Sequence, residues 1–276
     1  MNATSLLEPK LRVRGATKVY QTGSGDLLAL DRCSIDIAAG EIVSVVGPSG
    51  SGKTTLLWAM SGLHGLSSGE VLLDGTKITG PNPQIGMVFQ EANLLPWRTI
   101  DDNIRFPFEI KGTKPDEAWI ASLMHRVGLD GFGKKMPREL SGGMQQRVAL
   151  VRALSFKPSV LLMDEPFGAL DAFTREEMNH LVEEIYLDTR TTIVLITHSI
   201  EEAIFLSDRI VVMSARPGRI AHVHDVPFER PRSMDIMSTK EVFDLTNTIK
   251  REIVGDQQSK ARVAQRPAAT AATPAS

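Results

Sequence analysis

Residues 47–55 read Gly47-Pro48-Ser49-Gly50-Ser51-Gly52-Lys53-Thr54-Thr55 and match the phosphate-loop pattern G-x-x-x-x-G-K-[ST]. The apolar run Ile42-Val43-Ser44-Val45-Val46 ends just before this loop, and a helical pattern begins at Thr55. Glycines let several backbone N–H groups converge on one anion, and the N-terminus of the helix adds positive potential. The stretch therefore predicts a nucleotide site to which all of its residues contribute, with Lys53 as the cation for the outer phosphates and Thr54 as a Mg²⁺ ligand.

Two carboxylates follow a second apolar strand, in the run Val160-Leu161-Leu162-Met163-Asp164-Glu165. Asp164 stands at the C-terminal end of the strand and is positioned to hold Mg²⁺, often through water. Glu165 follows directly and is a candidate base that orients or deprotonates an attacking water. A carboxylate that activates water favours hydrolysis of the nucleotide over transfer of its phosphate to another substrate.

Short, almost continuous apolar runs indicate strands that helices bury on both faces of a parallel sheet. They are residues 42–46, 160–163, 192–196 and 210–213. Residues 11–37 instead alternate in polarity, which is typical of half-exposed antiparallel strands. From residue 91 to about 158 the strand signal fades and apolar residues recur at helical spacing. We expect an α/β fold: a P-loop ATPase core with a mainly parallel sheet, an N-terminal antiparallel β region and a helical insertion at about 91–158.

The ends of the chain carry weaker patterns. Residues 1–10 are expected to be a flexible N-terminus, and residues 11–254 to form one ATP-binding domain. After Gly255 the composition turns to Gln, Ser, Ala, Thr and Pro, which bury too little apolar surface to offset ordering. We therefore expect residues 255–276 to be a disordered tail that ATP hydrolysis does not need.

The composition excludes several classes of protein. The 31 Lys and Arg residues against 33 Asp and Glu residues give a net charge of -2, which offers no basic field for a phosphate backbone and argues against a nucleic-acid partner. Cys33 is the only cysteine, so an internal disulfide is excluded. The longest apolar runs fall far short of the roughly 20 residues that span a bilayer. We expect a protein of a reducing compartment that associates with a membrane only through a partner.

A second glycine-rich segment reads Leu140-Ser141-Gly142-Gly143-Met144-Gln145-Gln146-Arg147. Ser141 can cap a helix that begins with Gly142 and Gly143, whose N–H groups are accessible to an anion. One nucleotide does not need two phosphate sites in one chain, which suggests that two chains share each nucleotide. The segment resembles the signature motif of the ATP-binding subunits of ABC transporters, and the resemblance extends from about Leu11 to Ile220.

The resemblance implies roles for further residues. Tyr20 matches the aromatic residue that stacks on adenine, with packing at the sheet edge as the alternative. Gln90 resembles the Q-loop glutamine that senses Mg²⁺ and the γ-phosphate, and His198 resembles the switch histidine that contacts the γ-phosphate. Asp171 ends a stretch, Gly168-Ala169-Leu170-Asp171, that resembles the D-loop at a dimer interface. The expected catalytic residues are then Lys53, Gln90, Glu165 and His198, and the expected Mg²⁺ ligands are Thr54, Gln90 and Asp164.

The resemblance also implies partners. Two chains would form a head-to-tail homodimer with two ATP molecules between them, each lying between residues 47–55 of one chain and 141–143 of the other. The segment from Gln90 to Trp97 would contact transmembrane permease subunits, although its apolar residues also suit local core packing. Such a subunit is peripheral to the cytoplasmic face of the bacterial inner membrane and depends indirectly on a periplasmic solute-binding protein.

Residues 91–99 and 214–220 look like the nitrate, sulfonate and taurine group of bacterial importers. An exporter or lipid-transport ATPase shares the nucleotide motifs and remains an alternative. A soluble ABC ATPase that acts on DNA or ribosomes is a second alternative, but such a protein usually has a long coiled coil or a second cassette in one chain. A regulatory protein that binds ATP without turnover is a third alternative, and it would not need Glu165 and His198. His222-Val223-His224 could chelate a metal, but no further ligand is evident near it in the sequence.

Overall fold

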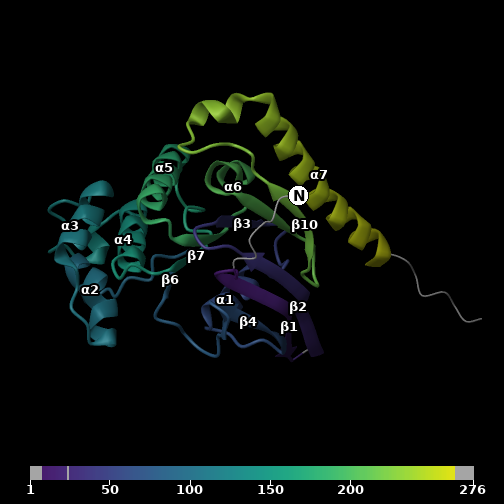
Figure 1. Cartoon of the computed structure of the whole chain (residues 1–276), viewed down its shortest axis with the longest axis horizontal. Coiled ribbons are helices and arrows are strands. Elements are labelled where there is room, and N and C mark those ends of the chain that lie inside the picture. The colour runs from purple at the N-terminus through teal and green to yellow at the C-terminus, as the bar shows by residue number, and fades with distance from the viewer. Residues whose placement is uncertain (1–7, 24, 265–276) are drawn as a thin grey trace, which may run out of the picture.

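A computed structural model gives the structure of the chain and describes residues 8–23 and 25–264, with side chains up to residue 256. The strands form two sheets, and the helices lie around and beside them (Figure 1). Residues 1–7 of the expected flexible N-terminus and residues 265–276 of the expected tail lie outside the described residues. In the described part of the chain, every helix is too short or too polar to cross a bilayer.

The N-terminal sheet is antiparallel and has the strand order β2-β1-β4-β5. Its strands are β1 (Leu11–Thr22), β2 (Gly25–Ile37), β4 (Ser68–Leu73) and β5 (Thr76–Lys77). Leu11 faces Ile37 across the β1–β2 pair, and both side chains are buried. The alternating polarity of residues 11–37 correctly predicts this region, because one face of the sheet packs on the core.

The second sheet has six strands in the order β10-β9-β3-β8-β7-β6. They are β3 (Ile42–Val46), β6 (Ile85–Val88), β7 (Val160–Asp164), β8 (Thr192–Ile196), β9 (Arg209–Met213) and β10 (Ile220–Asp225). All neighbours are parallel except β10, which runs antiparallel to β9. Because the carboxyl ends of parallel strands meet at one edge, this sheet gathers the segments that follow β3, β6, β7 and β8.

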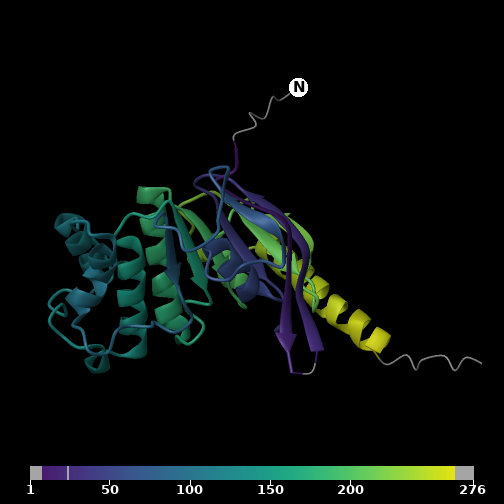
Figure 2. The ribbon, with the colours of Figure 1, turned by 90° about the horizontal axis from the view of Figure 1, so that it is seen from below.

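The helical insertion lies between β6 and β7, as expected. It contains α2 (Ile100–Lys111), α3 (Glu117–Arg126), a 3₁₀ turn (Pro137–Glu139) and α4 (Gly142–Leu154). Thr99, Asp116 and Ser141 cap these helices by accepting a hydrogen bond from a backbone N–H in the first turn. Figure 2 shows the insertion at one end of the molecule and the antiparallel strands β1 and β2 toward the other.

The remaining helices are α1 (Lys53–Ser61), α5 (Ala172–Thr189), α6 (Ile200–Leu206) and α7 (Lys240–Ala264), and a 3₁₀ turn (Met234–Ser238) precedes α7. α1 lies between the two sheets and contacts β1, β7 and β8. Cys33 belongs to the apolar cluster around α1 and is 1% exposed. Burial raises the pKa of its thiol to about 11.

The disordered tail is expected to begin at Gly255, and this prediction is wrong for residues 255–264. α7 continues through Gly255 to Ala264. A glycine inside a helix costs only about 1 kcal/mol, and most of the residues that follow are good helix formers. The helix is already nucleated by the packed turns that precede Gly255, so adding further turns is easy. The low apolar content of the segment excludes a core but does not exclude a helix.

Candidate active site

A cleft of about 480 Å³ opens at the edge of the six-stranded sheet where β3, β7 and β8 end. Several of the expected site residues line it, together with one residue from the loop after β9. The lining residues used below are Tyr20, Gly47, Ser49, Gly50, Gly52, Lys53, Thr54, Thr55, Glu165, His198 and Arg216. A cleft of this size is large enough for a small organic ligand.

The phosphate loop depends on its glycines for steric reasons. Gly47 has φ +149°, and a Cβ at this position would lie 2.6 Å from the backbone oxygen of Met213. Gly52 has φ +88° directly before α1, and its Cβ would lie 2.9 Å from the backbone oxygen of Ala29. Only a residue without a side chain fits either position. The loop is therefore packed tightly against the strands behind it, with its N–H groups at the start of α1.

Lys53 lies at the first position of α1 and is 8% exposed. Its Nζ donates to the backbone oxygens of Gly47 at 3.0 Å and Pro48 at 3.1 Å, so the ammonium group reaches across the loop. Burial lowers the pKa of Lys53, and the nearby Glu165 and Asp164 carboxylates oppose that effect. The ammonium group is thus a largely desolvated cation inside a loop that can surround a phosphate.

Thr54 and Asp164 meet at the floor of the cleft. The Thr54 Oγ1 donates to Asp164 Oδ1 at 3.1 Å, and Asp164 is 7% exposed. Burial raises the pKa of Asp164, while the Thr54 hydrogen bond acts in the opposite direction. A hydroxyl and a carboxylate side by side are the oxygen donors that Mg²⁺ prefers, so these two residues fit the ion that the sequence implies.

Glu165 and His198 stand together at the mouth of the cleft. The His198 Nδ1 lies 3.4 Å from Glu165 Oε2. Glu165 adopts φ +45°, a left-handed conformation that is uncommon for a residue with a side chain. Its backbone N–H donates to the Ile196 oxygen at 2.9 Å, which ties the residue to the end of β8. The structure thus brings the expected base and the expected switch histidine to the same point.

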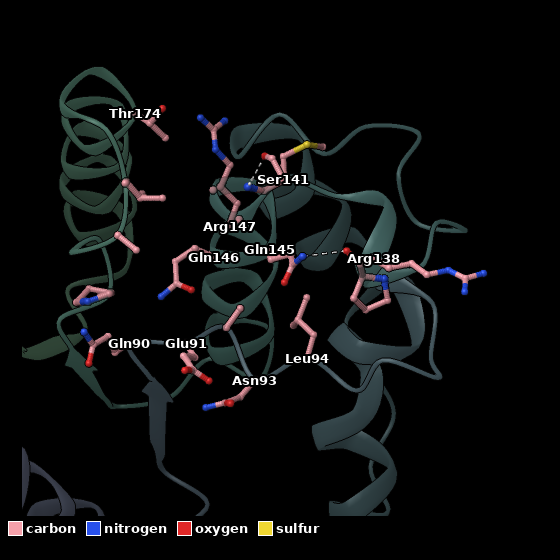
Figure 3. Close-up of a pocket in the computed structure, with 18 of the residues that line it drawn as sticks. Gln90, Glu91, Asn93, Leu94, Arg138, Ser141, Gln145, Gln146, Arg147 and Thr174 are labelled. Carbon is pink, nitrogen blue, oxygen red and sulfur yellow. Dashed lines mark hydrogen bonds between the residues drawn. The ribbon is translucent and has the colours of Figure 1, made fainter.

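A second and larger cleft, of about 1060 Å³, lies between the segment after β6, the start of α4 and the start of α5. Figure 3 shows Gln90, Glu91, Asn93 and Leu94 on one side of it, Ser141 and its neighbours around α4, and Thr174 on the facing helix. Ser141 caps α4 by accepting from the Met144 N–H at 3.3 Å. Asp171 caps α5, and the Thr174 N–H that it accepts at 3.0 Å holds its pKa below the usual range.

The expected site residues therefore separate into two groups within one chain. Tyr20, the phosphate loop, Glu165 and His198 line the smaller cleft, with Asp164 beneath it; Pro48 and Ser51 belong to the loop without lining the cleft. Gln90, Ser141, Gly142, Gly143 and Asp171 line the larger cleft instead. Arg216 lines the smaller cleft and is absent from the expected set. The only sequence signal for it is that Arg216 belongs to residues 214–220, a stretch that looks like the nitrate, sulfonate and taurine group of importers.

The histidine pair on β10 has a neighbour that the sequence does not reveal. Glu252 on α7 lies 2.8 Å from His224 Nε2 and 3.6 Å from His222 Nδ1, measured to its carboxylate oxygens. The contact ties α7 to β10 and joins residues 28 positions apart. In the described part of the chain, no group of three or more candidate ligands has the geometry of a metal site.

A family model described as ABC transporter matches residues 30–168. The chain belongs to the ABC transporter family. The matched residues include the whole phosphate loop, the segment at residues 140–147 and the carboxylates Asp164 and Glu165 at the end of β7. Membership makes the chain an ATPase, the activity that the paired carboxylates Asp164 and Glu165 indicate from the sequence.

Named relatives in the ABC transporter family are similar over most of their length. A taurine import ATP-binding protein of Roseobacter denitrificans is 48% identical over 79% of this chain and 82% of the relative. An aliphatic sulfonates import ATP-binding protein of Bacillus cereus is 42% identical over 83% of this chain and 91% of the relative. The dimeric structure of a bacterial ABC transporter cassette is 32% identical with a TM-score of 0.71, and the match covers 79% of this chain and 100% of the cassette.

The same cassette has also been solved as a dimer in a post-hydrolysis state bound to ADP and Pi, again with a TM-score of 0.71. These similarities bear out the ABC ATPase architecture expected from the sequence, with its antiparallel region, mainly parallel sheet and helical insertion.

Proposed function

We propose that this chain is the ATP-binding and ATP-hydrolysing subunit that powers a membrane importer of a small anion, such as taurine, another sulfonate or nitrate. The observation that carries the hydrolytic part is the cleft in which Lys53, Glu165 and His198 meet beside Thr54 and Asp164. The names of the relatives, which are import ATP-binding proteins for taurine and aliphatic sulfonates, support the transport part.

The cleft residues divide the work of hydrolysis. The loop N–H groups and Lys53 bind the phosphates, and Tyr20 at the rim of the cleft packs on the adenine ring. A water oxygen attacks the γ-phosphorus, its proton passes to the Glu165 carboxylate, and the bond from phosphorus to the β–γ bridging oxygen breaks to release ADP. His198 contacts the γ-phosphate and lies close enough to Glu165 to keep its carboxylate oriented. Thr54 and Asp164 would hold Mg²⁺, which neutralises charge on the phosphates.

We propose that the larger cleft serves a second chain. In a head-to-tail dimer, Ser141, Gly142 and Gly143 of one protomer would meet the γ-phosphate bound to the phosphate loop of its partner, with Asp171 at the interface. Gln90 and the segment that follows it also line this cleft, so closure of the dimer would change the surroundings of that segment directly. The separation of the two residue groups within one chain supports this arrangement.

The segment from Gln90 to Trp97 is our candidate contact with transmembrane permease subunits. Trp97 is 72% exposed, and tryptophan is enriched in protein–protein interfaces relative to the rest of the protein surface. The chain would then lie at the cytoplasmic face of the inner membrane and act on substrate delivered by a periplasmic binding protein.

Co-purification from native membranes tests the transport role. A tagged chain, isolated from detergent-solubilised membranes, should bring a polytopic membrane protein with it, which mass spectrometry identifies. Trp97→Ser should lose that protein while the isolated variant still hydrolyses ATP. Phe243→Ser is the matched control, because Phe243 is 64% exposed on α7, outside this segment. Recovery of soluble partners alone would refute the importer and favour a soluble ABC ATPase.

A further inference from the structure

The loop between β9 and β10, residues 214–219, is fixed against the phosphate loop. A Cβ at Gly218 would lie 1.9 Å from the backbone oxygen of Ser51, so the two loops are in direct contact there. The Gly218 N–H donates to the Ala29 oxygen at 2.9 Å, and the Gly218 oxygen accepts from the Asp31 N–H at 2.9 Å. The β9–β10 loop thus has a defined position relative to the smaller cleft, which is called the nucleotide cleft from here on.

The two arginines of this loop have different surroundings. Arg219 is paired with Asp31, to which its Nε donates at 2.9 Å, and this contact lowers the pKa of Asp31. Arg216 has no hydrogen-bond or ion-pair partner among the residues whose side chains are described, although it is exposed and cationic. Its Nη2 lies 3.2 Å from the point that a Cβ on Gly50 would occupy, and it lines the nucleotide cleft.

We infer that Arg216 is a phosphate-binding residue of this ATPase, additional to the phosphate loop and Lys53. The inference rests on the proposed binding of ATP in this cleft. A guanidinium group held at the rim of a phosphate loop, with no partner among the described side chains, matches the fork geometry with which arginine binds phosphate oxygens. Arg216 lies beside Gly50 of the phosphate loop, so its guanidinium group contacts phosphates that ATP and ADP share.

α7 holds the loop that carries Arg216. The Asp256 carboxylate of α7 accepts a hydrogen bond from the N–H of Ala215, the residue immediately before Arg216. The Ser214 Oγ accepts from the Arg219 N–H at 3.1 Å and closes the loop from inside. Asp256 is therefore a positioning residue that acts through Arg216, and α7 is connected to the nucleotide cleft.

Calorimetric titration of ADP into the full-length chain tests the inference. Arg216→Ala should weaken ADP binding by about three- to tenfold, the range between an exposed ion pair and a charged hydrogen bond. Arg216→Lys should retain most of the affinity, because a point charge at the same place still attracts phosphate. The loss in Arg216→Ala should shrink in high salt, since an exposed ionic contact is screened. Arg251→Ala, which removes an exposed cation of α7, should bind like the parent.

Asp256→Ala extends the test to positioning. It should weaken ADP binding in the parent and add nothing in the Arg216→Ala background, because both changes remove the same contact. A loss of equal size in both backgrounds would make Asp256 merely structural. Unchanged ADP affinity in Arg216→Ala overturns the inference while leaving the proposed function intact. A parent chain that binds neither ADP nor ATP overturns the proposed function itself.

Discussion

Glu165, the proposed base, has an unusual backbone conformation. Its φ of +45° places a side-chain-bearing residue in the left-handed region, which costs on the order of 1 kcal/mol or more. The conformation turns the chain directly after β7, where the backbone is tied to Ile196, and brings the carboxylate within 3.4 Å of His198. The strained backbone therefore belongs to the residue that we propose as the base, and strain of this kind is common at functional sites.

Glu165→Gln separates binding from hydrolysis at this residue. Gln keeps the shape but cannot take a proton from water, so we expect ATP binding to be retained and turnover to fall by about 10²- to 10⁴-fold. Lys53→Ala should instead weaken ATP binding, because it removes the cation inside the loop. Titration calorimetry and phosphate release measure the two effects. Glu201→Gln is the control, because it makes the same change at an exposed glutamate three positions after His198, and it should be fully active. Parent-like turnover in Glu165→Gln would contradict its role as base.

Residues were predictable from the sequence where a motif is local. The phosphate loop and the Asp164-Glu165 pair are continuous stretches, so spacing alone identifies them. Arg216 and Glu252 were not predictable in the same way, because their importance comes from contacts made across the fold. Arg216 meets Gly50, and Glu252 meets His222 and His224. Only the docking of the β9–β10 loop and of α7 creates these neighbours.

At the scale of the element, α6 depends on a buried arginine. The helix begins at Ile200, directly after the cap Ser199, and so follows His198 closely. Arg232 is 3% exposed, and its Nη1 donates to the oxygens of Ile204 at 2.8 Å, Phe205 at 2.9 Å and Ser207 at 2.8 Å. Burial lowers the pKa of Arg232 to about 10, so it is still cationic at neutral pH. The guanidinium group satisfies carbonyls that the end of a helix leaves without partners.

Arg232→Lys should therefore destabilise the chain. A lysine ammonium group does not reproduce the planar fork that reaches several carbonyls, and it leaves buried acceptors unpaired. We expect a loss of about 2–4 kcal/mol in the free energy of unfolding, measured by urea denaturation. Arg251→Lys on the exposed face of α7 is the matched control and should stay within about 0.5 kcal/mol of the parent. Equal midpoints for both variants would show that the Arg232 contacts contribute little.

Secondary-structure elements were predictable from the sequence where burial determines the spacing of apolar residues. The uniformly buried strands β3, β7 and β8 read as continuous apolar runs, and the half-exposed strands β1 and β2 read as alternation. The end of α7 carries no such pattern, because helix propensity rather than burial extends it. The capping by Arg232 was equally hidden, since it joins α6 to a segment that follows β10.

At the scale of the whole molecule, we propose that the two clefts are halves of one site. The smaller cleft holds the phosphate loop, Glu165 and His198, and the larger holds Ser141, Gly142, Gly143 and Asp171. Figures 1 and 2 show α4 of the insertion and α1 of the phosphate loop at separate places in the fold. A second copy of the chain can supply to each nucleotide the half that its own protomer keeps elsewhere.

Complementation between two inactive variants tests that arrangement. Ser141→Arg adds bulk and charge to the larger cleft, so it should block hydrolysis while ADP still binds to the phosphate loop with parent affinity. Lys53→Ala should be inactive because it damages the other half. A mixed dimer contains one intact site, formed by the phosphate loop of the Ser141→Arg chain and the signature segment of the Lys53→Ala chain. Mixing the two should restore activity, up to about a quarter of the parent rate for random pairing of independent sites. Activity that stays at the level of the separate variants would contradict a shared site, because each chain would then have to hydrolyse ATP with its own two halves.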